Sequence, residues 1–255
     1  MSVILCTMAR VGPVLAVAQT VARRGDIEGN IETHVRFAEA ASRHGARLVV
    51  FPELSLTGYE PDFAATHTLT PEDPRLEPLR GIAEKNDITI VAGAPYRSPK
   101  GIHIAAFAIQ HGGAHVYTKH HLHSGEERHF AAGTMGLQLA IGCERVGFAV
   151  CADTAHPEHA EAAAKAGATV YAAGVLITPT GIDADSAQLR DYARSHGMVV
   201  LMANHGGPSG GFQTAGMSAI WDDLGELVIQ TPGAGEALLL AHREGASIRG
   251  ESAKP

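Results

Sequence analysis

Three residues that could cooperate in catalysis, Glu53, Lys119 and Cys151, each stand at or just beyond the end of a run that is typical of a buried strand. The apolar residues 148–150 precede Cys151, and residues 48–51 lead to Glu53. A thiol in such a place is held rigidly and can still meet solvent. A carboxylate there is partly desolvated, which raises its pKa toward the range of a general base, and an ammonium group can stabilise charge developing on a carbonyl oxygen. Together the three residue types indicate attack by a thiol on a carbonyl carbon.

Each of these residues also has an ordinary structural explanation. An isolated free cysteine is most often a small core residue, because cysteine is among the most buried residue types. Glu53 taken alone is equally well an exposed acid at a strand end, and Lys119 a solvated surface lysine. The hypothesis of a catalytic site therefore rests on the combination.

The segments around the three residues resemble the motifs of the nitrilase, or carbon-nitrogen hydrolase, superfamily, in the order glutamate, lysine, cysteine. The resemblance runs from about Val14 to about Leu240. It implies an α+β fold, a four-layer αββα sandwich in which helices cover two mixed sheets. It also implies a homodimer or larger homo-oligomer, and no metal or organic cofactor. The segments that carry the resemblance are Phe51-Pro52-Glu53-Leu54 with Thr57-Gly58-Tyr59, Tyr117-Thr118-Lys119-His120-His121-Leu122 with Phe130 and Gly133, and Val150-Cys151-Ala152-Asp153 with Pro157-Glu158.

The resemblance also implies a role for each residue. Glu53 takes the proton of Cys151, the sulfur attacks an amide carbon, and Lys119 and the backbone N–H of Ala152 hold the oxyanion. Lys119 favours the thiolate, so we expect the pKa of Cys151 to be lowered relative to other thiols. Many family members carry a second glutamate four residues before the motif phenylalanine, which predicts Glu126 as the fourth catalytic residue, with Glu127 as the alternative.

The predicted substrate-binding residues are Tyr59, Ala152 and His156. Ala152 is small where many family members have a larger residue, so the pocket could be wider here. His156 belongs to a pair, Ala155-His156, that replaces an Arg-Phe pair of the family. Its ring could contact a polar group of the substrate or could pack against the start of a helix.

A cluster of histidines, His120, His121, His123 and His129, invites a metal hypothesis. Adjacent histidines on one strand point to opposite faces, and no cysteine or aspartate at ligand spacing completes a four-ligand set. The sequence therefore predicts no metal site. His123 replaces the proline often found after the motif leucine in the family, and we expect it to shape the loop.

The predicted function is hydrolysis of a non-peptide carbon–nitrogen bond in a small linear amide or N-carbamoyl compound, through a cysteine thioester, with release of ammonia or an amine. Alternatives are a nitrilase that hydrolyses nitriles and a catalytically degenerate binding protein of the same fold. A glutaminase that feeds a synthetase is less expected, because no synthetase domain follows Pro255.

Composition excludes several other classes of protein. The chain has 255 residues, 45% of them hydrophobic and 18% charged, which is typical of a globular protein. Its formal charge of -7 and scattered basic residues argue against nucleic acid as a partner, and no run approaches the ~20 apolar residues of a membrane span. Three cysteines without a CxxC pair fit a reducing compartment, so we predict a cytoplasmic protein whose partners are its amide substrate and further copies of itself.

Hydrophobic periodicity predicts the elements that position the three residues. A single carbon-nitrogen hydrolase domain is expected over residues 13–245, after an N-terminal extension of residues 1–12 and before a loose, polar C-terminal tail of residues 246–255. Asn30 is expected to cap the first helix, which Gly45 ends. The other predicted helices are 74–86, 157–166 and 184–196, and the predicted strands are 14–19, 46–51, 88–95, 102–109, 114–118, 169–177, 198–204 and a hairpin of 218–221 with 227–231.

Overall fold

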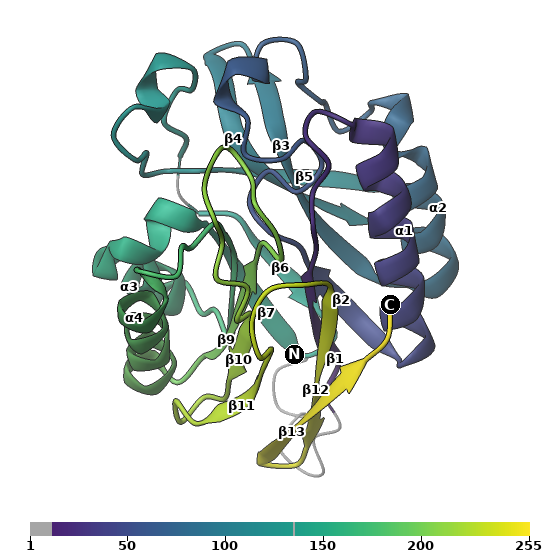
Figure 1. Ribbon diagram of the computed structural model, residues 1–255. Helices are drawn as coiled ribbons and strands as arrows, with labels where there is room; N and C mark the ends of the chain where they lie inside the picture. Colours follow the sequence, from purple (N-terminus) through teal and green to yellow (C-terminus); the bar gives the residue numbers. More distant parts are fainter. Residues whose placement is uncertain (1–11, 135) are drawn as a thin grey trace.

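Two β-sheets are stacked face to face, and a pair of helices covers the outer face of each (Figure 1). The computed structural model describes residues 12–134 and 136–255. The predicted N-terminal extension lies outside the described residues except for Gly12. The arrangement is the expected α+β sandwich of four layers, which confirms the fold predicted from the sequence.

The first sheet has seven strands in the order β13-β12-β1-β2-β3-β4-β5. Neighbouring strands among β1, β2 and β3 run parallel, and all other neighbours are antiparallel, so the sheet is mixed. Its strands are β1 (Val14–Gln19), β2 (Ala46–Val50), β3 (Thr89–Ser98), β4 (Gly101–Gln110), β5 (Gly113–Thr118), β12 (Ala237–Glu244) and β13 (Ser247–Ala253).

The second sheet has six strands in the order β11-β10-β9-β8-β7-β6, and its three central strands are parallel. Parallel central strands are buried on both faces, which explains their continuous apolar runs. Its strands are β6 (Gln138–Ile141), β7 (Glu144–Val150), β8 (Val170–Val175), β9 (Val199–Asn204), β10 (Ala219–Trp221) and β11 (Leu227–Gln230).

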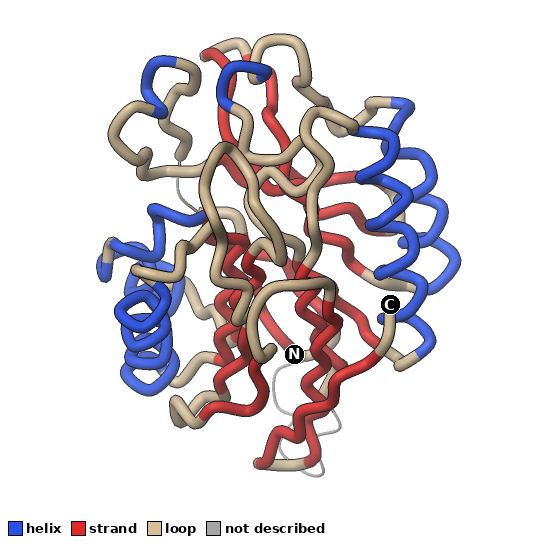
Figure 2. Tube along the Cα trace, viewed as in Figure 1, coloured by secondary structure: helices blue, strands red, loops and turns tan. Residues whose placement is uncertain are grey.

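The helices divide evenly between the two outer faces. On the first sheet lie α1 (Ile27–Arg43) and α2 (Glu77–Asn86), and on the second lie α3 (Pro157–Lys165) and α4 (Ile182–His196). Loops, tan in Figure 2, gather over the upper ends of the strands. Four short 3₁₀ helices lie in the connections: η1 (Pro61–Phe63), η2 (Pro74–Leu76), η3 (Glu126–Arg128) and η4 (Cys151–Ala155).

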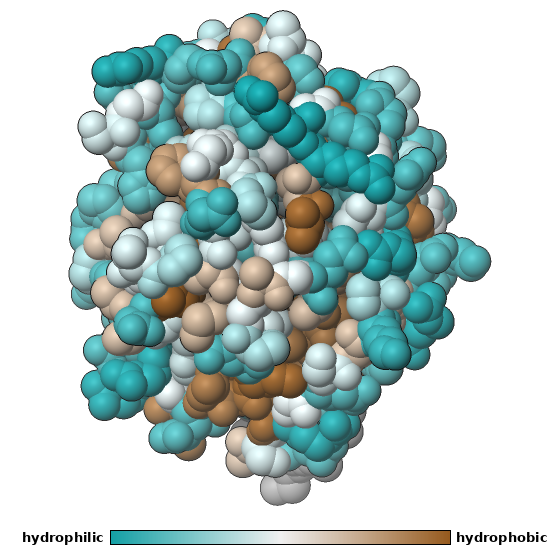
Figure 3. Space-filling model, in the orientation of Figure 1, coloured by the Kyte–Doolittle hydropathy of each residue, from teal (hydrophilic) through white to brown (hydrophobic). Residues whose placement is uncertain are grey.

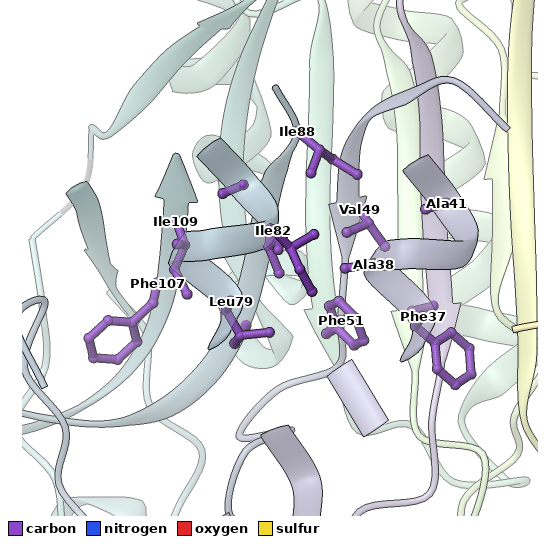
Figure 4. Close-up of a cluster of buried hydrophobic side chains, with 14 of the residues drawn as sticks. Phe37, Ala38, Ala41, Val49, Phe51, Leu79, Ile82, Ile88, Phe107 and Ile109 are labelled. Carbon is purple, nitrogen blue, oxygen red and sulfur yellow. The ribbon is translucent and has the colours of Figure 1, made fainter. Parts of the chain in front are cut away.

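Three hydrophobic clusters fill the three interfaces between the layers. In the first, Phe37 of α1 and Leu79 of α2 pack against Val49 of β2 and Phe107 of β4 (Figure 4). The second lies between the sheets, and the third joins α3 and α4 to the second sheet. Burial of each large side chain contributes roughly 1.5–3 kcal/mol, so these interfaces hold the strand ends in fixed positions.

The structure corrects two predictions. Asp26, and not Asn30, caps α1, because its side chain accepts a hydrogen bond from the backbone of Gly29. Asn30 lies inside α1, where its side-chain amide connects the loop before the helix with the loop that follows β2. The C-terminal segment is not loose, since residues 247–253 form β13 and pair with β12 along their whole length. Among the described residues, no helix is both long and apolar enough to cross a membrane.

Candidate active site

The ends of β2, β5 and β7 bring Glu53, Lys119 and Cys151 to one place. All three side chains are buried, and η3 adds the buried Glu126. The four predicted catalytic residues therefore come from three connections that lie far apart in the sequence, because Lys119 and Glu126 share the one that follows β5.

Lys119 is the centre of the site. Its Nζ donates to Glu53 Oε1 at 2.8 Å and to Glu126 Oε1 and Oε2 at 2.7 and 2.9 Å. Glu127 points elsewhere, because its carboxylate accepts a hydrogen bond from the backbone of Gly125 and is exposed. The structure thus places Glu126, and not its neighbour, against the lysine.

Glu53 is fixed on one side and open on the other. His205, which follows β9, donates its Nε2–H to the backbone oxygen of Glu53 at 2.7 Å. The carboxylate oxygen Oε2 is buried and accepts no hydrogen bond from any described residue. Since Oε1 is occupied by Lys119, Oε2 is the atom available to take a proton.

Cys151, the predicted nucleophile, stands in a constrained turn. Cys151 begins η4 with φ of 42°, in the left-handed region that residues other than glycine rarely adopt. Asp153 holds this turn: its Oδ2 accepts the backbone N–H of Val150 at 3.0 Å and the hydroxyl of Tyr117 at 2.7 Å. Its Oδ1 accepts the backbone N–H of His121 at 2.8 Å, so one buried carboxylate links the cysteine turn to the lysine segment.

The sulfur of Cys151 has two polar neighbours besides Glu53 and Lys119. His123 Nε2 lies 3.3 Å from Sγ, and the backbone oxygen of Leu176 lies 3.6 Å from it. The side chain of His123 therefore faces the nucleophile, whereas its backbone N–H donates to Glu126 Oε2 at 2.8 Å. A proline in this position could make neither contact.

Burial shifts the proton equilibria of the site. Burial raises the pKa of Glu53 to about 7. The charge of Lys119 opposes this rise, and the charge of Glu126 adds to it. Burial and the charge of Glu53 also raise the pKa of the Cys151 thiol, although Lys119 lowers it. The expectation of a lowered thiol pKa is therefore wrong. Burial lowers the pKa of Lys119. The negative charges of Glu53, Cys151 and Glu126 raise it by more, so the net pKa of the lysine rises.

Two adjoining cavities lie at the site, and the inner one reaches Cys151. The inner one has a volume of about 290 Å³ and is lined by Glu53, Cys151, Tyr59, His123, Ser124, Leu176, Thr178 and Phe212. The outer one, of about 640 Å³, shares Tyr59, Ser124 and Phe212 with it and adds charged side chains of both signs. The inner cavity suits a short group next to the sulfur, and the outer cavity offers room for a polar remainder.

Tyr59 lies at the boundary between the cavities. Its hydroxyl donates to Glu126 Oε1 at 2.7 Å, and its ring packs edge-on against Phe212 at a centroid distance of 6.0 Å. Burial and the charges of Glu53 and Glu126 raise its pKa, so the hydroxyl stays a donor. Ala152 is buried next to the nucleophile and does not line the inner cavity.

His156 lies outside both cavities. Its ring stacks on that of His121 with centroids 3.6 Å apart and an interplanar angle of 9°, and its Nδ1 lies 3.2 Å from Glu158 Oε1. These three residues place possible metal-ligand atoms within 4.8 Å of one another. In stacked, parallel rings the in-plane lone pairs do not converge, so a shared ion would require the rings to rotate.

Phe212, Thr178 and Leu176 have no motif that marks them as cavity residues, because they lie on loops that the fold alone brings to the nucleophile. His123 does carry a signal, since a histidine stands where the resembling family often has proline. Its predicted role was limited to the loop, whereas its ring reaches the sulfur.

Residues 14–250 match the family model described as carbon-nitrogen hydrolase. A glutamine-dependent NAD(+) synthetase of Aquifex aeolicus is 28% identical over 155 residues, which are 58% of this chain and 27% of the synthetase, so this chain spans only about a quarter of that relative's length. Among solved structures, a cysteine-to-alanine mutant of the amidase from Nesterenkonia sp. AN1 in complex with butyramide is 27% identical, with a TM-score of 0.81 and 94% of each chain covered. A glutamate-to-leucine mutant of the same amidase, 28% identical with a TM-score of 0.81 and 92% of each chain covered, shows covalent addition of the acetamide moiety of fluoroacetamide at the active-site cysteine.

Proposed function

Because the chain belongs to the carbon-nitrogen hydrolase family, we propose that it cleaves the carbon–nitrogen bond of a small linear amide or N-carbamoyl compound through a thioester on Cys151. The observation that carries this proposal is the placement of Lys119 between Glu53 and Glu126 next to a buried thiol. A cation held in this way is preorganised for an oxyanion, which is the largest single contribution to many acyl transfers.

In the first half of the reaction, Oε2 of Glu53 takes the proton of the thiol as Sγ bonds to the amide carbon. The electron pair of the carbonyl moves to oxygen, where the charge faces Lys119 and the backbone N–H of Ala152. Glu53 then returns the proton to the nitrogen as the carbon–nitrogen bond breaks. A carboxyl group whose pKa is about 7 suits both directions of transfer near neutral pH.

In the second half, Glu53 removes a proton from a water molecule that attacks the thioester carbon. The carbon–sulfur bond breaks, the acid leaves, and the proton returns to the sulfur of Cys151. Because the inner cavity measures about 290 Å³, the acyl group is a short one.

Amide cleavage is favoured over nitrile cleavage by the solved amidase structures, one of which holds butyramide. The similarity to a glutamine-dependent synthetase supports glutamine as a second candidate substrate, with ammonia as the product. The homo-oligomeric state and the cytoplasmic location predicted from the sequence stay predictions.

A substrate panel tests the proposal. Release of ammonia is measured with butyramide, acetamide, glutamine, N-carbamoyl amino acids and the corresponding nitriles, and the intact mass of the protein is recorded during turnover. We expect ammonia from a short amide or carbamoyl compound and an acyl adduct on Cys151. Turnover that persists in Cys151→Ala, which should fold normally, would contradict the proposal.

A further inference from the structure

The thiol of Cys151 has bases on two sides. Glu53 reaches it from the end of β2, and the imidazole of His123 reaches it from the loop before η3, with Nε2 3.3 Å from Sγ. Both side chains line the inner cavity. His123 is anchored by its own backbone, whose N–H donates to Glu126 Oε2, so the ring is placed by a residue that also holds Lys119.

We propose that His123 is a second acid–base catalytic residue: below neutral pH its Nε2, in place of Oε2 of Glu53, takes the proton of the Cys151 thiol as the sulfur–carbon bond forms and returns it to the nitrogen as the carbon–nitrogen bond breaks. The transfer needs no co-reactant: the thiol loses a proton, the imidazole becomes imidazolium, and the departing amine carries the proton away. The first transfer is a property of the free enzyme, and only the second rests on the proposed amide hydrolysis.

The two bases differ in the pH range where they can act. Glu53, with a pKa of about 7, is largely protonated below neutral pH and cannot then accept the thiol proton. The ring of His123 lines the inner cavity, and its partial desolvation, with the charges of Lys119 and His156, lowers its pKa below the usual 6.5, whereas Glu126 and Asp185 oppose the shift. The neutral imidazole therefore remains a base at slightly acidic pH, where Glu53 is not.

The charge of Asp185, on α4, acts on the imidazole of His123. Asp185 is about half-buried, and this burial raises its pKa, which the charge of His123 opposes; the charge of Asp185 in turn favours the protonated form of His123. Acceptance of the thiol proton by Nε2 requires the tautomer with the proton on Nδ1, and a nearby carboxylate stabilises the imidazolium that follows.

Alkylation of Cys151 by iodoacetamide tests the first transfer without any substrate. Rates are measured from pH 5.5 to 9 for the unaltered protein, His123→Gln and Glu53→Gln, and peptide mass locates the adduct. We expect His123→Gln to react about tenfold or more slowly below pH 7, since a positioned base contributes at least this much. Glu53→Gln should slow alkylation mainly above pH 7, where the carboxylate of the unaltered protein is deprotonated. An unchanged rate profile in His123→Gln would overturn the proposal.

Two controls separate catalysis from folding. His111→Gln makes the same replacement at an exposed turn and should leave the rate profile unchanged. His123→Ala should keep its melting temperature and regain alkylation when imidazole is added, because the base then comes from solution. A well-folded His123→Ala protein that reacts slowly and gains nothing from imidazole would show that the ring acts only through structure, and would overturn the proposal.

Turnover distinguishes this inference from the proposed function. If the protein hydrolyses amides and kcat of His123→Gln equals that of the unaltered protein across the pH range, the acid–base role is wrong while the amidase function stands. If no amide or carbamoyl compound is hydrolysed but alkylation still depends on His123, the amidase function is wrong and the proton transfer from the thiol stands.

Discussion

Single residues of the site illustrate which properties a sequence can predict. Glu53, Lys119, Cys151 and Glu126 follow from motif order, and the structure places them together. The pKa of Cys151 does not follow, because its direction depends on how completely neighbouring layers exclude water. Residue identity alone would favour a lowered value, since a lysine is nearby.

The protonation state of Glu53 should control the overall rate. In the proposed mechanism Glu53 activates water in the second half of the reaction, so it must be deprotonated, and burial raises its pKa to about 7. We expect kcat of amide hydrolysis to rise with pH through about 7. In Glu53→Gln, kcat should fall at least a hundredfold, the lower end of the usual range for a general base. A pH–rate series checks this, and a rate that is flat from pH 5.5 to 8 would contradict it.

The same carboxylate should make the folded state less stable as pH rises. A group whose pKa is raised on folding stabilises fully below its unfolded pKa of about 4.5 and loses that contribution as pH passes the folded value near 7. Relative to Glu53→Gln, the unaltered protein should therefore lose on the order of 3 kcal/mol of unfolding free energy between pH 4.5 and 8. Urea unfolding of both proteins at the two pH values measures this difference; a constant difference would show that Glu53 is not destabilised by burial.

At the scale of elements, the loop that carries Glu53 is confined by two strands. A Cβ on Gly93 of β3 would lie 2.3 Å from the backbone nitrogen of Leu54, and one on Gly174 of β8 would lie 2.7 Å from the backbone oxygen of Phe51. Glycine at these positions lets both sheets approach the loop backbone directly. The position of the general base therefore depends on strands that contribute no side chain to the chemistry.

Gly93→Ala should displace this loop and impair catalysis. The added methyl group meets backbone that can move only with the loop, so we expect a loss of about 1–3 kcal/mol in stability. A shift of about 1 Å at Glu53 should lower kcat/KM by about a hundredfold. Steady-state kinetics and urea unfolding measure the two effects.

Gly81→Ala is the matched control. Gly81 lies within α2, where a Cβ would meet nothing within 4 Å. Activity should be unchanged and stability should rise by roughly 0.5–1 kcal/mol, because alanine is the better helix former. Equal effects of the two substitutions on kcat/KM would contradict the argument from close approach.

Elements with long apolar or periodic runs were predictable from sequence, and those that depend on partners were not. β1 has the predicted bounds because its apolar run is clear. β13 is small and polar, so its strand conformation comes from pairing with β12 and not from its own composition. The start of α1 was misplaced because Asn30 resembles a cap in sequence, whereas its side chain bonds to the distant backbone of Leu56.

At the scale of the whole molecule, β13 connects the two sheets on the side away from the active site. Its partner β12 pairs with β1, and Gly250 lies opposite Ala241, which in turn pairs with Leu15 near the start of β1. Figure 3 shows hydrophobic side chains gathered between β11 and β12. Ile248 of β13 packs against the cluster between the sheets, so the C-terminal strand helps to close the sandwich.

Gly250→Val should weaken this closure. A Cβ on Gly250 would lie 2.7 Å from the backbone oxygen of Val228 and 2.8 Å from Cβ of Ile229, both on β11, so a larger side chain pushes β13 away from the second sheet. We expect a loss of about 1–3 kcal/mol, which lowers the melting temperature of a chain of this size by about 2–12 °C. Because the substitution lies at the opposite ends of the strands from Cys151, kcat at 25 °C should stay unchanged.

Ser252→Val, on the same strand at an exposed position, is the control and should shift the melting temperature little. If both variants melt at the same temperature, contact between β13 and β11 does not stabilise the sandwich. If Gly250→Val lowers kcat while the protein is folded, the two ends of the sheets are coupled, and the active site depends on the contact between β13 and β11.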